Sequence, residues 1–392
     1  MKETLFTILQ VALREIRRMT SQSMYLLVTI IFPVATTLFF WSLMKEGVPT
    51  KMPVAVVDLD NTALSARLVR NIDVTPLSRV VSHLQSESEA MSELRKGNIY
   101  GFVVIPDNLQ SDIMMSKKPV ISYYYQNSFL IAGGLMQNDL TYILHTLSAG
   151  VSKQKLEATG HDENRIMARI QPIVLDTHLL FNPYSNYSAY VTTIILPIML
   201  QLFILLITVY SILSEIKEKT SREWLRLSGK SLPVALAGKL LPYSMIFFIV
   251  MMFQNLILYK MLQIPLHTGF LGLAAVSVLF VLAYQAIGIF SAGLFPMMRH
   301  ALNLSAFYGI LALTLCGFSF PVEYMPAVFQ FWAEAFPVRH YMHIFQSQML
   351  AGFGIQYAFL SYLFLMLFLF VPFATLFRLK KALILQDSIE KV

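Results

Sequence analysis

Long apolar stretches alternate with short polar connections along most of the chain. A helix needs about 20 predominantly apolar residues to cross the hydrocarbon core of a bilayer. Six stretches have this character: Met24 to Leu43, Ala189 to Leu213, Leu241 to Leu262, Phe270 to Phe295, Ala301 to Phe320 and Tyr357 to Phe377. The pattern therefore predicts a mainly α membrane protein with six transmembrane helices.

The segment between the first two apolar stretches, residues 45–186, is too polar to cross a membrane and long enough to form a domain. Three short apolar runs in it indicate strands: 54–57, 99–105 and 120–125. Helical patterns that contain Leu64 and Met91 lie between these runs. Because strands that alternate with helices are typical of α/β domains, we expect an α/β domain here, inserted between helices 1 and 2.

Lysine and arginine near the span ends predict the orientation of the helices, because these residues resist translocation. They gather at four places along the chain: Arg14, Arg17 and Arg18; Lys217, Lys219, Arg222, Arg226, Lys230 and Lys239; Arg299; and Arg378, Lys380 and Lys381. All four places fall on one side of the membrane, so we expect both termini to be cytoplasmic. Residues 214–239 then form a charged cytoplasmic loop, which we interpret as a docking surface that begins at Glu215.

The residues before the first apolar stretch have a helical apolar period. Leu5, Leu9, Ala12 and Ile16 recur on one face, and arginines gather toward the end. Such a helix can lie in the membrane interface with its apolar face in lipid. We expect residues 1–44 to contain this interfacial helix and the first span, with an ordinary helix packed on protein as the alternative. No small-residue cleavage site follows the first apolar run, so we expect no cleaved signal peptide.

Composition supports a membrane protein and argues against other classes. The 392 residues are 56% hydrophobic and 14% charged, whereas a soluble domain has about 25% charged residues. The net charge of +7 comes from basic residues beside apolar spans rather than from one basic domain, so we expect no nucleic-acid partner. The single cysteine, Cys316, excludes an intrachain disulfide and a cysteine metal cluster.

Gly229, Lys230 and Ser231 resemble the end of a phosphate-binding loop. That loop needs an earlier glycine where this chain has Trp224, and a strand where the pattern predicts a helix. A glycine that ends a cytoplasmic helix explains these residues better. The chain therefore shows no ATPase site of its own.

Two other groups of residues suggest chemistry, and each has a structural explanation. Asp58 and Asp60 resemble a metal-binding pair of a glycosyltransferase, but acids between a strand and a helix more often close the turn and cap the helix. His340 and His343 share a helical face near Glu334, without the His-Glu-x-x-His pattern of zinc enzymes. We therefore predict no catalytic residue and no metal site.

Polar side chains inside the predicted spans need partners away from lipid. They are Gln201, Gln254, Asn255, Gln285 and Asn303. Two interpretations stay open, because such residues either line a substrate path or hydrogen-bond helices together. Gly288, Ala292 and Gly293 permit a close helix approach, which is also compatible with a dimer contact.

The connection before the last apolar stretch, residues 317–345, is rich in aromatic residues and interrupted by Pro321, Pro326 and Pro337. Irregular backbone at membrane depth is tolerated only where protein or a cavity covers it. We expect short re-entrant helices within residues 320–345 on the outer side. The alternative is an aromatic belt at the membrane surface.

Several segments together resemble the ABC-2-type permease family, the membrane subunits of ABC exporters. The matching segments are Pro53 to Asn61, Gly97 to Pro106, Asn182 to Tyr184, Glu215 to Thr220, Leu225, Gly238 to Tyr243, Phe320 to Pro326 and Phe336 to Tyr341. The first two resemble the extracytoplasmic domain of the longer members. The likeness covers nearly the whole chain in order, and it departs from the family pattern at Arg226 to Lys230.

The resemblance implies a bacterial inner-membrane permease that works as a homodimer, or as a heterodimer with a related permease, on ABC ATP-binding subunits. It implies no cofactor on this chain, because ATP and Mg are used by the ATP-binding subunit. The ATPase-coupling residues that it implies are Glu215, Glu218, Lys219, Thr220, Leu225, Gly238 and Lys239. The outer-gate residues that it implies are Pro321, Glu323, Met325, Pro326, Pro337, Arg339 and Tyr341.

We therefore expect the permease subunit of an ATP-driven exporter, which moves a hydrophobic or amphipathic substrate such as a lipid, a drug or an envelope component. A second hypothesis is a non-transporting membrane signalling or scaffold protein whose outer domain acts on a periplasmic partner. A third is a membrane enzyme that uses Asp58 and Asp60. Membrane lipid is an expected partner, and a periplasmic adaptor stays open.

Overall fold

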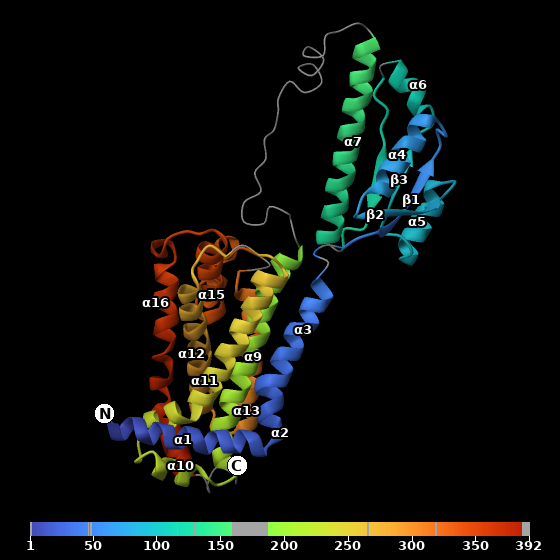
Figure 1. Cartoon of the computed structure of the whole chain (residues 1–392). Coiled ribbons are helices and arrows are strands. Elements are labelled where there is room, and N and C mark those ends of the chain that lie inside the picture. The colour runs from blue at the N-terminus through green and yellow to red at the C-terminus, as the bar shows by residue number, and fades with distance from the viewer. Residues whose placement is uncertain are drawn as a thin grey trace. The chain divides into compact units, whose positions relative to one another are not determined.

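The computed structural model describes residues 2–45, 47, 49–115, 117–128, 130–158, 187–264, 266–317 and 320–385. The chain forms two compact units (Figure 1): Met1–Gly47 with Leu179–Val392, and Val48–His178. We refer to them as the larger and the smaller unit and describe each by itself. The matching segment Asn182 to Tyr184 lies outside the described residues.

The smaller unit contains a four-stranded sheet with the strand order β2-β1-β3-β4. Its strands are β1 Met52–Asp58, β2 Ser78–His83, β3 Gly101–Ile105 and β4 Ser122–Tyr125. β1 pairs in parallel with β2 and β3, and β3 pairs antiparallel with β4. The three expected strands are confirmed as β1, β3 and β4. The edge strand β2 was not predicted, because only Val80 and Val81 among its residues are large and apolar.

Helices cover both faces of this sheet. They are α4 Ala63–Val74, α5 Glu87–Lys96, α6 Leu109–Met114 and α7 Leu130–Ala158. Leu68, Leu109 and Leu140, from α4, α6 and α7, pack into one apolar core. Ala90 of α5 packs with Phe102 in a second core. Alternate residues of β1 enter the two cores, so they lie on opposite faces of the sheet.

Asp58 and Asp60 close the turn that follows β1. Asp58 Oδ1 accepts hydrogen bonds from the backbone N–H groups of Asp60 and Asn61, both at 3.1 Å. Asp60 accepts from the hydroxyl of Thr62, which is the N-cap of α4, and from the Gln110 N–H at 3.3 Å. The turn-closing interpretation is confirmed, and it removes the observation on which the membrane-enzyme hypothesis rested.

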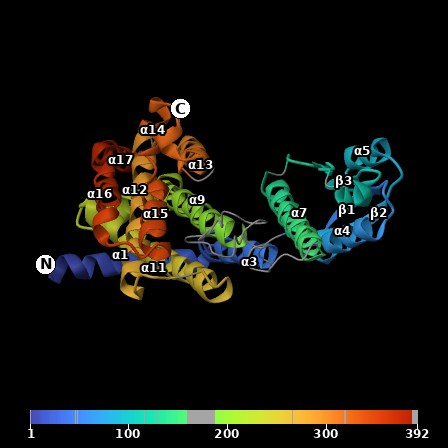
Figure 2. The ribbon, with the colours of Figure 1, turned by 90° about the horizontal axis from the view of Figure 1, so that it is seen from above.

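The larger unit is a bundle of apolar helices. Its elements up to the fourth apolar stretch are α1 Lys2–Ser21, α2 Ser23–Leu26, η1 Leu27–Ile31, α3 Phe32–Met44, α9 Tyr187–Lys217, α10 Ser221–Leu227, α11 Leu232–Leu256, η2 Ile257–Met261 and α12 Phe270–Leu294. They are followed by α13 Met298–Leu315, η3 Val322–Tyr324, α14 Ala327–Ala333, α15 Pro337–Ile344, η4 Phe345–Leu350, η5 Ile355–Tyr357, α16 Phe359–Phe368, η6 Val371–Ala374 and α17 Leu376–Ile384. Figure 2 shows α12 among α9, α11, α15 and α16, so α12 lies inside the bundle.

Four segments of the described residues are long and apolar enough to cross a membrane: Ser23–Met44, Tyr187–Lys217, Leu232–Met261 and Phe270–Leu294. There are up to five if the pair Phe359–Ala374 and Leu376–Ile384, bent by 41°, is one span. The expected fifth stretch forms α13, whose first turn carries Arg299 and His300. The structure supports four or five spans by length and composition, and the sixth span stays a prediction.

Polar residues within the spans join neighbouring helices. Gln201 of α9 donates from Nε2 to the Gly309 carbonyl of α13 at 3.1 Å. Gln254 of α11 donates to the Thr37 hydroxyl of α3 at 3.1 Å, and Gln285 of α12 accepts a hydroxyl from α11 at 2.7 Å. For these three residues the helix-bonding interpretation is confirmed.

Glycines of α12 permit close packing inside the chain. A Cβ atom added at Gly288 would lie 2.8 Å from Thr208 of α9. A Cβ atom added at Gly293 would lie 2.5 Å from the Thr375 hydroxyl, which precedes α17. Contacts within this chain therefore account for both glycines.

Helix α1 lies across one end of the bundle, where α10 and α17 also lie (Figure 1), and we term this the α1 end. Large exposed apolar residues form a stripe along it: Leu5, Phe6, Leu9, Leu13 and Ile16. The face toward the bundle buries Val11, Ala12, Glu15 and Met19. The expected amphipathic helix is present, but Ala12 was assigned to the wrong face because it packs on protein.

Candidate functional site

The charged residues 214–239 form the end of α9, the helix α10 and the start of α11. Two faces of α10 differ in exposure. Its buried residues are Ser221, Trp224 and Leu225. Its exposed residues, which we term the α10 face, are Arg222, Glu223, Arg226 and Leu227. This short helix thus presents charge outward while it packs on the bundle.

Buried charged groups from three helices meet at the α1 end. Glu15 of α1, Glu215 of α9 and Lys239 of α11 are each at most 1% exposed. The Lys239 ammonium donates to Glu15 Oε2 at 2.6 Å and to Glu215 Oε1 at 2.7 Å. The Tyr243 hydroxyl donates to Glu15 Oε1 at 2.7 Å. A single ammonium group therefore joins the carboxylates of two other helices.

Two arginines of α1 surround the Glu215 carboxylate. Arg14 donates to Oε1 and Oε2 at 2.7 and 3.1 Å, and Arg18 donates to Oε1 at 2.5 Å. Burial opposes charge on both guanidinium groups, yet their contacts with Glu215 raise the pKa of Arg14 and Arg18 above the ordinary value. Both arginines stay charged and compensate the buried carboxylate. We term the assembly of Arg14, Glu15, Arg18, Glu215, Lys239 and Tyr243 the ion network.

Helix α10 is fixed on two sides. The Lys239 ammonium lies 5.1 Å from the centroid of the Trp224 ring, within the range of a cation–π interaction. The Ser221 hydroxyl donates to the Leu383 carbonyl at 2.6 Å, and Arg222 Nε donates to the Ile384 carbonyl at 3.2 Å. Helix α10 is therefore held by the ion network on one side and by the end of α17 on the other.

The expectation that the docking surface begins at Glu215 is wrong, because Glu215 and Lys239 are fully buried. Their partners Arg14, Glu15 and Arg18 lie on the N-terminal helix α1, and each buried charge is thereby paired with an opposite one. The sequence shows that these residues are charged, but it does not show which residues they contact in the folded chain. The two residues therefore hold the loop in place from inside.

The other coupling residues divide between surface and interior. Glu218 and Lys219 are exposed, Thr220 is half-buried, and Leu225 and Gly238 are buried. The Thr220 hydroxyl donates to Glu215 Oε2 at 2.5 Å. Only Glu218 and Lys219 of this set adjoin the α10 face as exposed charges.

Glu15 and Tyr243 were missed as site residues, and Arg14 and Arg18 were interpreted only as orientation signals. One signal was available, because Glu15 follows the apolar positions Ala12 and Leu13 within an amphipathic helix. An acid at such a position needs a buried partner. The identity of that partner was not contained in local sequence.

Gly229 and Lys230 end the connection after α10 in left-handed conformations, with φ of 63° and 65°. Glycine adopts this region without a steric penalty. The helix-ending interpretation of the Gly-Lys-Ser residues is confirmed.

The segment before α16 forms short helices that run along the first half of α12. At the start of α15, the Val338 N–H donates at 3.0 Å to the hydroxyl of Tyr284 in the middle of α12. At the end of η4, the Met349 carbonyl accepts at 3.0 Å from the N–H of His267, which precedes α12. The chain thus enters the bundle beside Tyr284 and returns toward the first residues of α12.

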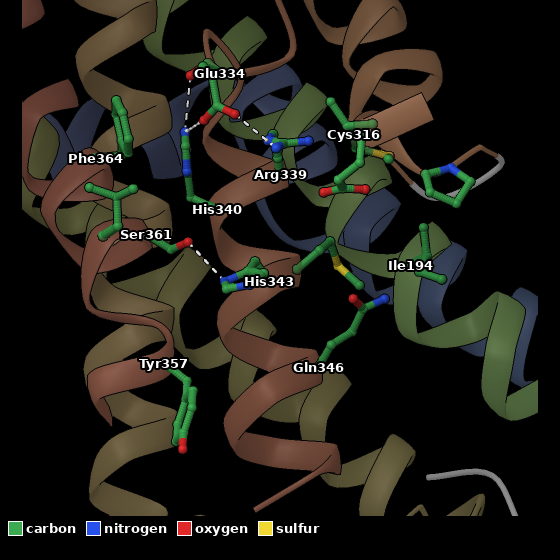
Figure 3. A pocket seen from close by; sticks show the side chains of 16 residues that line it. Ile194, Cys316, Glu334, Arg339, His340, His343, Gln346, Tyr357, Ser361 and Phe364 are labelled. Carbon is green, nitrogen blue, oxygen red and sulfur yellow. Dashed lines mark hydrogen bonds and ion pairs between the residues drawn. The ribbon is translucent and has the colours of Figure 1, made fainter. Parts of the chain in front are cut away.

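A cavity of about 520 Å³ lies beside α15 (Figure 3). Arg339 and Glu334 form an ion pair across its wall at 2.8 Å. His340 Nε2 lies 3.0 Å from the Glu334 carbonyl, and His343 Nδ1 lies 3.1 Å from the Ser361 hydroxyl. We term this space the polar cavity, because charged and polar side chains line much of it.

The expected gate residues lie in three environments. Pro321, Glu323 and Arg339 line the polar cavity. Pro337 and Tyr341 are buried, Met325 is half-buried and Pro326 is exposed. Within the described part of the chain, no three histidine, cysteine or acidic residues are grouped to hold a metal.

The model of the ABC-2 family transporter protein family matches residues 24–378. No curated protein matches the chain. The match begins within the first apolar span and ends within α17, so it covers most of the chain and both units. The chain therefore belongs to the ABC-2 transporter family, and it is a multi-pass permease subunit of an ABC transporter.

Proposed function

We propose that this permease subunit works in an ATP-driven exporter of a bacterial inner membrane and moves a hydrophobic or amphipathic substrate outward. The family comprises membrane transport subunits that are not themselves catalytic, which implies a separate ABC ATP-binding partner. ATP and Mg are used by that partner. Basic residues in α1, α10 and α17 support a cytoplasmic α1 end and cytoplasmic termini. The smaller unit then lies outside.

The observation that carries the proposal is the ion network behind α10. The α10 face is exposed, while Trp224 and Ser221 fix the buried side of α10 to Lys239 and to α17. Displacement of α10 would therefore act on α1, α9 and α11 together. The nucleotide-bound ATP-binding subunit is the ligand that favours one conformation of the permease. In this mechanism the α10 face docks, and the ion network positions it.

Charge reversal on the α10 face should uncouple the two subunits. We expect Arg226→Glu to weaken binding of the ATP-binding subunit by about tenfold at low salt. The affinity of the variant should fall less between low and high salt than that of the wild type, because an attraction that salt screens is replaced by a repulsion that salt also screens. Co-purification and ATPase turnover of the complex at low and high salt measure both effects.

Arg299→Glu is the matched control. It reverses the same charge on an exposed residue at the start of α13, which is not part of the α10 face. Equal effects of the two variants, or full binding by Arg226→Glu, would contradict docking on the α10 face.

Transport itself is tested in inverted membrane vesicles. We expect ATP-dependent accumulation of an amphipathic fluorescent probe, because the cytoplasmic α1 end then faces the medium. ATP hydrolysis without accumulation of any probe would favour the signalling or scaffold function instead. The observation that favours this second function is the smaller unit, which has two apolar cores of its own.

The assembly that we propose contains two permease chains, identical or related, with two ATP-binding subunits. The segment from Pro321 to Tyr341 forms the outer gate beside the polar cavity, and its aromatic residues on α14 face membrane lipid. We propose that a periplasmic adaptor, if the assembly contains one, binds the smaller unit. Cross-linking and mass measurement of the purified complex count the permease chains and identify any adaptor.

A further inference from the structure

We infer that the polar cavity binds the protonated amine of a cationic amphiphile. This inference rests on the proposed transport function, because it names the class of molecule that the exporter carries. Two carboxylates and one guanidinium line the cavity, from Glu323, Glu334 and Arg339. The Arg339 and Glu334 charges compensate each other at 2.8 Å. Glu323 leaves the cavity with one uncompensated negative charge when the histidines are neutral.

The Glu323 carboxylate offers the cavity acceptor oxygens that no ion pair of the described residues occupies. Glu323 belongs to η3, which precedes α14, and it is exposed. Among the described residues, its carboxylate forms no ion pair. His340 is engaged with Glu334, and His343 is engaged with Ser361 (Figure 3). An ammonium group has three donors and no acceptor, so it matches a wall that offers free carboxylate oxygens.

Apolar side chains line the rest of the cavity and fit the body of an amphiphile. They are Ile194, Val322, Met342, Leu360 and Phe364. The volume of about 520 Å³ is within the range of small-molecule sites. Tyr357 and Leu360, which are 65% and 62% exposed, bring the cavity wall to the surface of the bundle at η5 and α16. An alkyl chain can therefore enter from the apolar surface of the bundle while its charged end reaches Glu323.

An anionic headgroup fits this cavity poorly. Arg339 is the cavity's only permanently cationic lining residue among those described, and its Nη2 group is paired with Glu334 at 2.8 Å. A carboxylate or phosphate would share Arg339 with Glu334 and would approach Glu323, and both acids have the same sign of charge as the ligand. A neutral hydroxyl escapes this repulsion but forms a weaker hydrogen bond than an ammonium group does.

Binding of three matched probes tests the inference. The full chain is reconstituted in nanodiscs of zwitterionic lipid, without ATP or the ATP-binding subunit. The probes carry one fluorophore and one alkyl chain, and they end in an amine, a hydroxyl or a carboxylate. We expect fluorescence anisotropy to show about tenfold tighter binding of the amine than of the alcohol, with the carboxylate weakest.

Variants at Glu323 assign the preference to the cavity. We expect Glu323→Gln to bind amine and alcohol equally, and Glu323→Lys to prefer the carboxylate probe. Glu157→Gln removes an exposed acid of the smaller unit and should keep the wild-type order. Equal binding of all three probes by the wild type, or an amine preference that survives Glu323→Gln, would overturn the inference.

Different results would refute the transport function and the amine-binding site. Amine binding with no ATP-dependent accumulation in vesicles would refute transport and leave the binding site intact. ATP-dependent accumulation of neutral or anionic probes, with no amine preference in nanodiscs, would refute the cationic substrate class and leave transport intact. The wild-type probe comparison decides this without any variant that might fold poorly.

Discussion

Replacing Lys239 by methionine should lower the free energy of unfolding by about 3–5 kcal/mol, because it leaves buried charge uncompensated. The ammonium group bonds Glu15 at 2.6 Å and Glu215 at 2.7 Å, and all three side chains are buried. Methionine keeps most of the apolar volume, so the loss reports charge rather than a cavity. Thermal unfolding of the purified chain in detergent measures the effect.

Lys217→Met is the matched control, since Lys217 ends α9 on the same side of the bundle and is exposed. Its effect should stay within about 0.5 kcal/mol, as for other surface substitutions. A similar loss in both variants would show that the ion network does not stabilise the bundle through Lys239.

A double variant identifies which of the two carboxylates, Glu15 or Glu215, causes more of the destabilisation when Lys239 is removed. Without Lys239, Glu215 keeps hydrogen bonds from Arg14 and Arg18, whereas among the described residues Glu15 keeps a hydrogen bond from the Tyr243 hydroxyl alone. Glu15→Gln should therefore recover at least about 1 kcal/mol in the Lys239→Met background, because it removes the stranded charge. Strictly additive losses would contradict a direct pairing of Glu15 with Lys239.

Gly238→Ala should destabilise the bundle by about 1–3 kcal/mol, although alanine is a better helix former than glycine. The added Cβ atom would lie 2.7 Å from Val11 Cβ and 2.8 Å from the Ile8 carbonyl oxygen, both on α1. Helix α1 has to move away from α11, which also strains the bond between Glu15 and Lys239. We expect a lower melting temperature and reduced ATPase coupling in the complex.

Ala237→Val provides the comparison one residue earlier on α11. This residue is exposed, so the added carbons meet no packed neighbour and cost only the lower helix propensity of valine, about 0.5 kcal/mol. A stabilising effect of Gly238→Ala would show that α1 is not packed tightly on α11.

Much of the fold was predictable because its signals are local. Apolar length located the helices α3, α9, α11 and α12, and alternation of short runs located β1, β3 and β4. The polar edge strand β2 was not predicted, because it is recognised as a strand by its pairing with β1, which the local sequence does not show. The interrupted helix pattern at Pro321, Pro326 and Pro337 indicated short helices, and their place beside Tyr284 came only from the structure.

The candidate site, like the fold, could be predicted from the sequence only in part. The membrane class, the family resemblance and the position of the charged residues 214–239 could be inferred from the sequence, because composition and motif order are properties of the chain alone. The burial of Glu215 and Lys239 and the exposure of Arg226 follow from the three-dimensional packing of the helices. Glu15 and Lys239 are 224 positions apart in sequence and 2.6 Å apart in space. Whether a charge faces solvent or a partner depends on such distant contacts, which no local pattern contains.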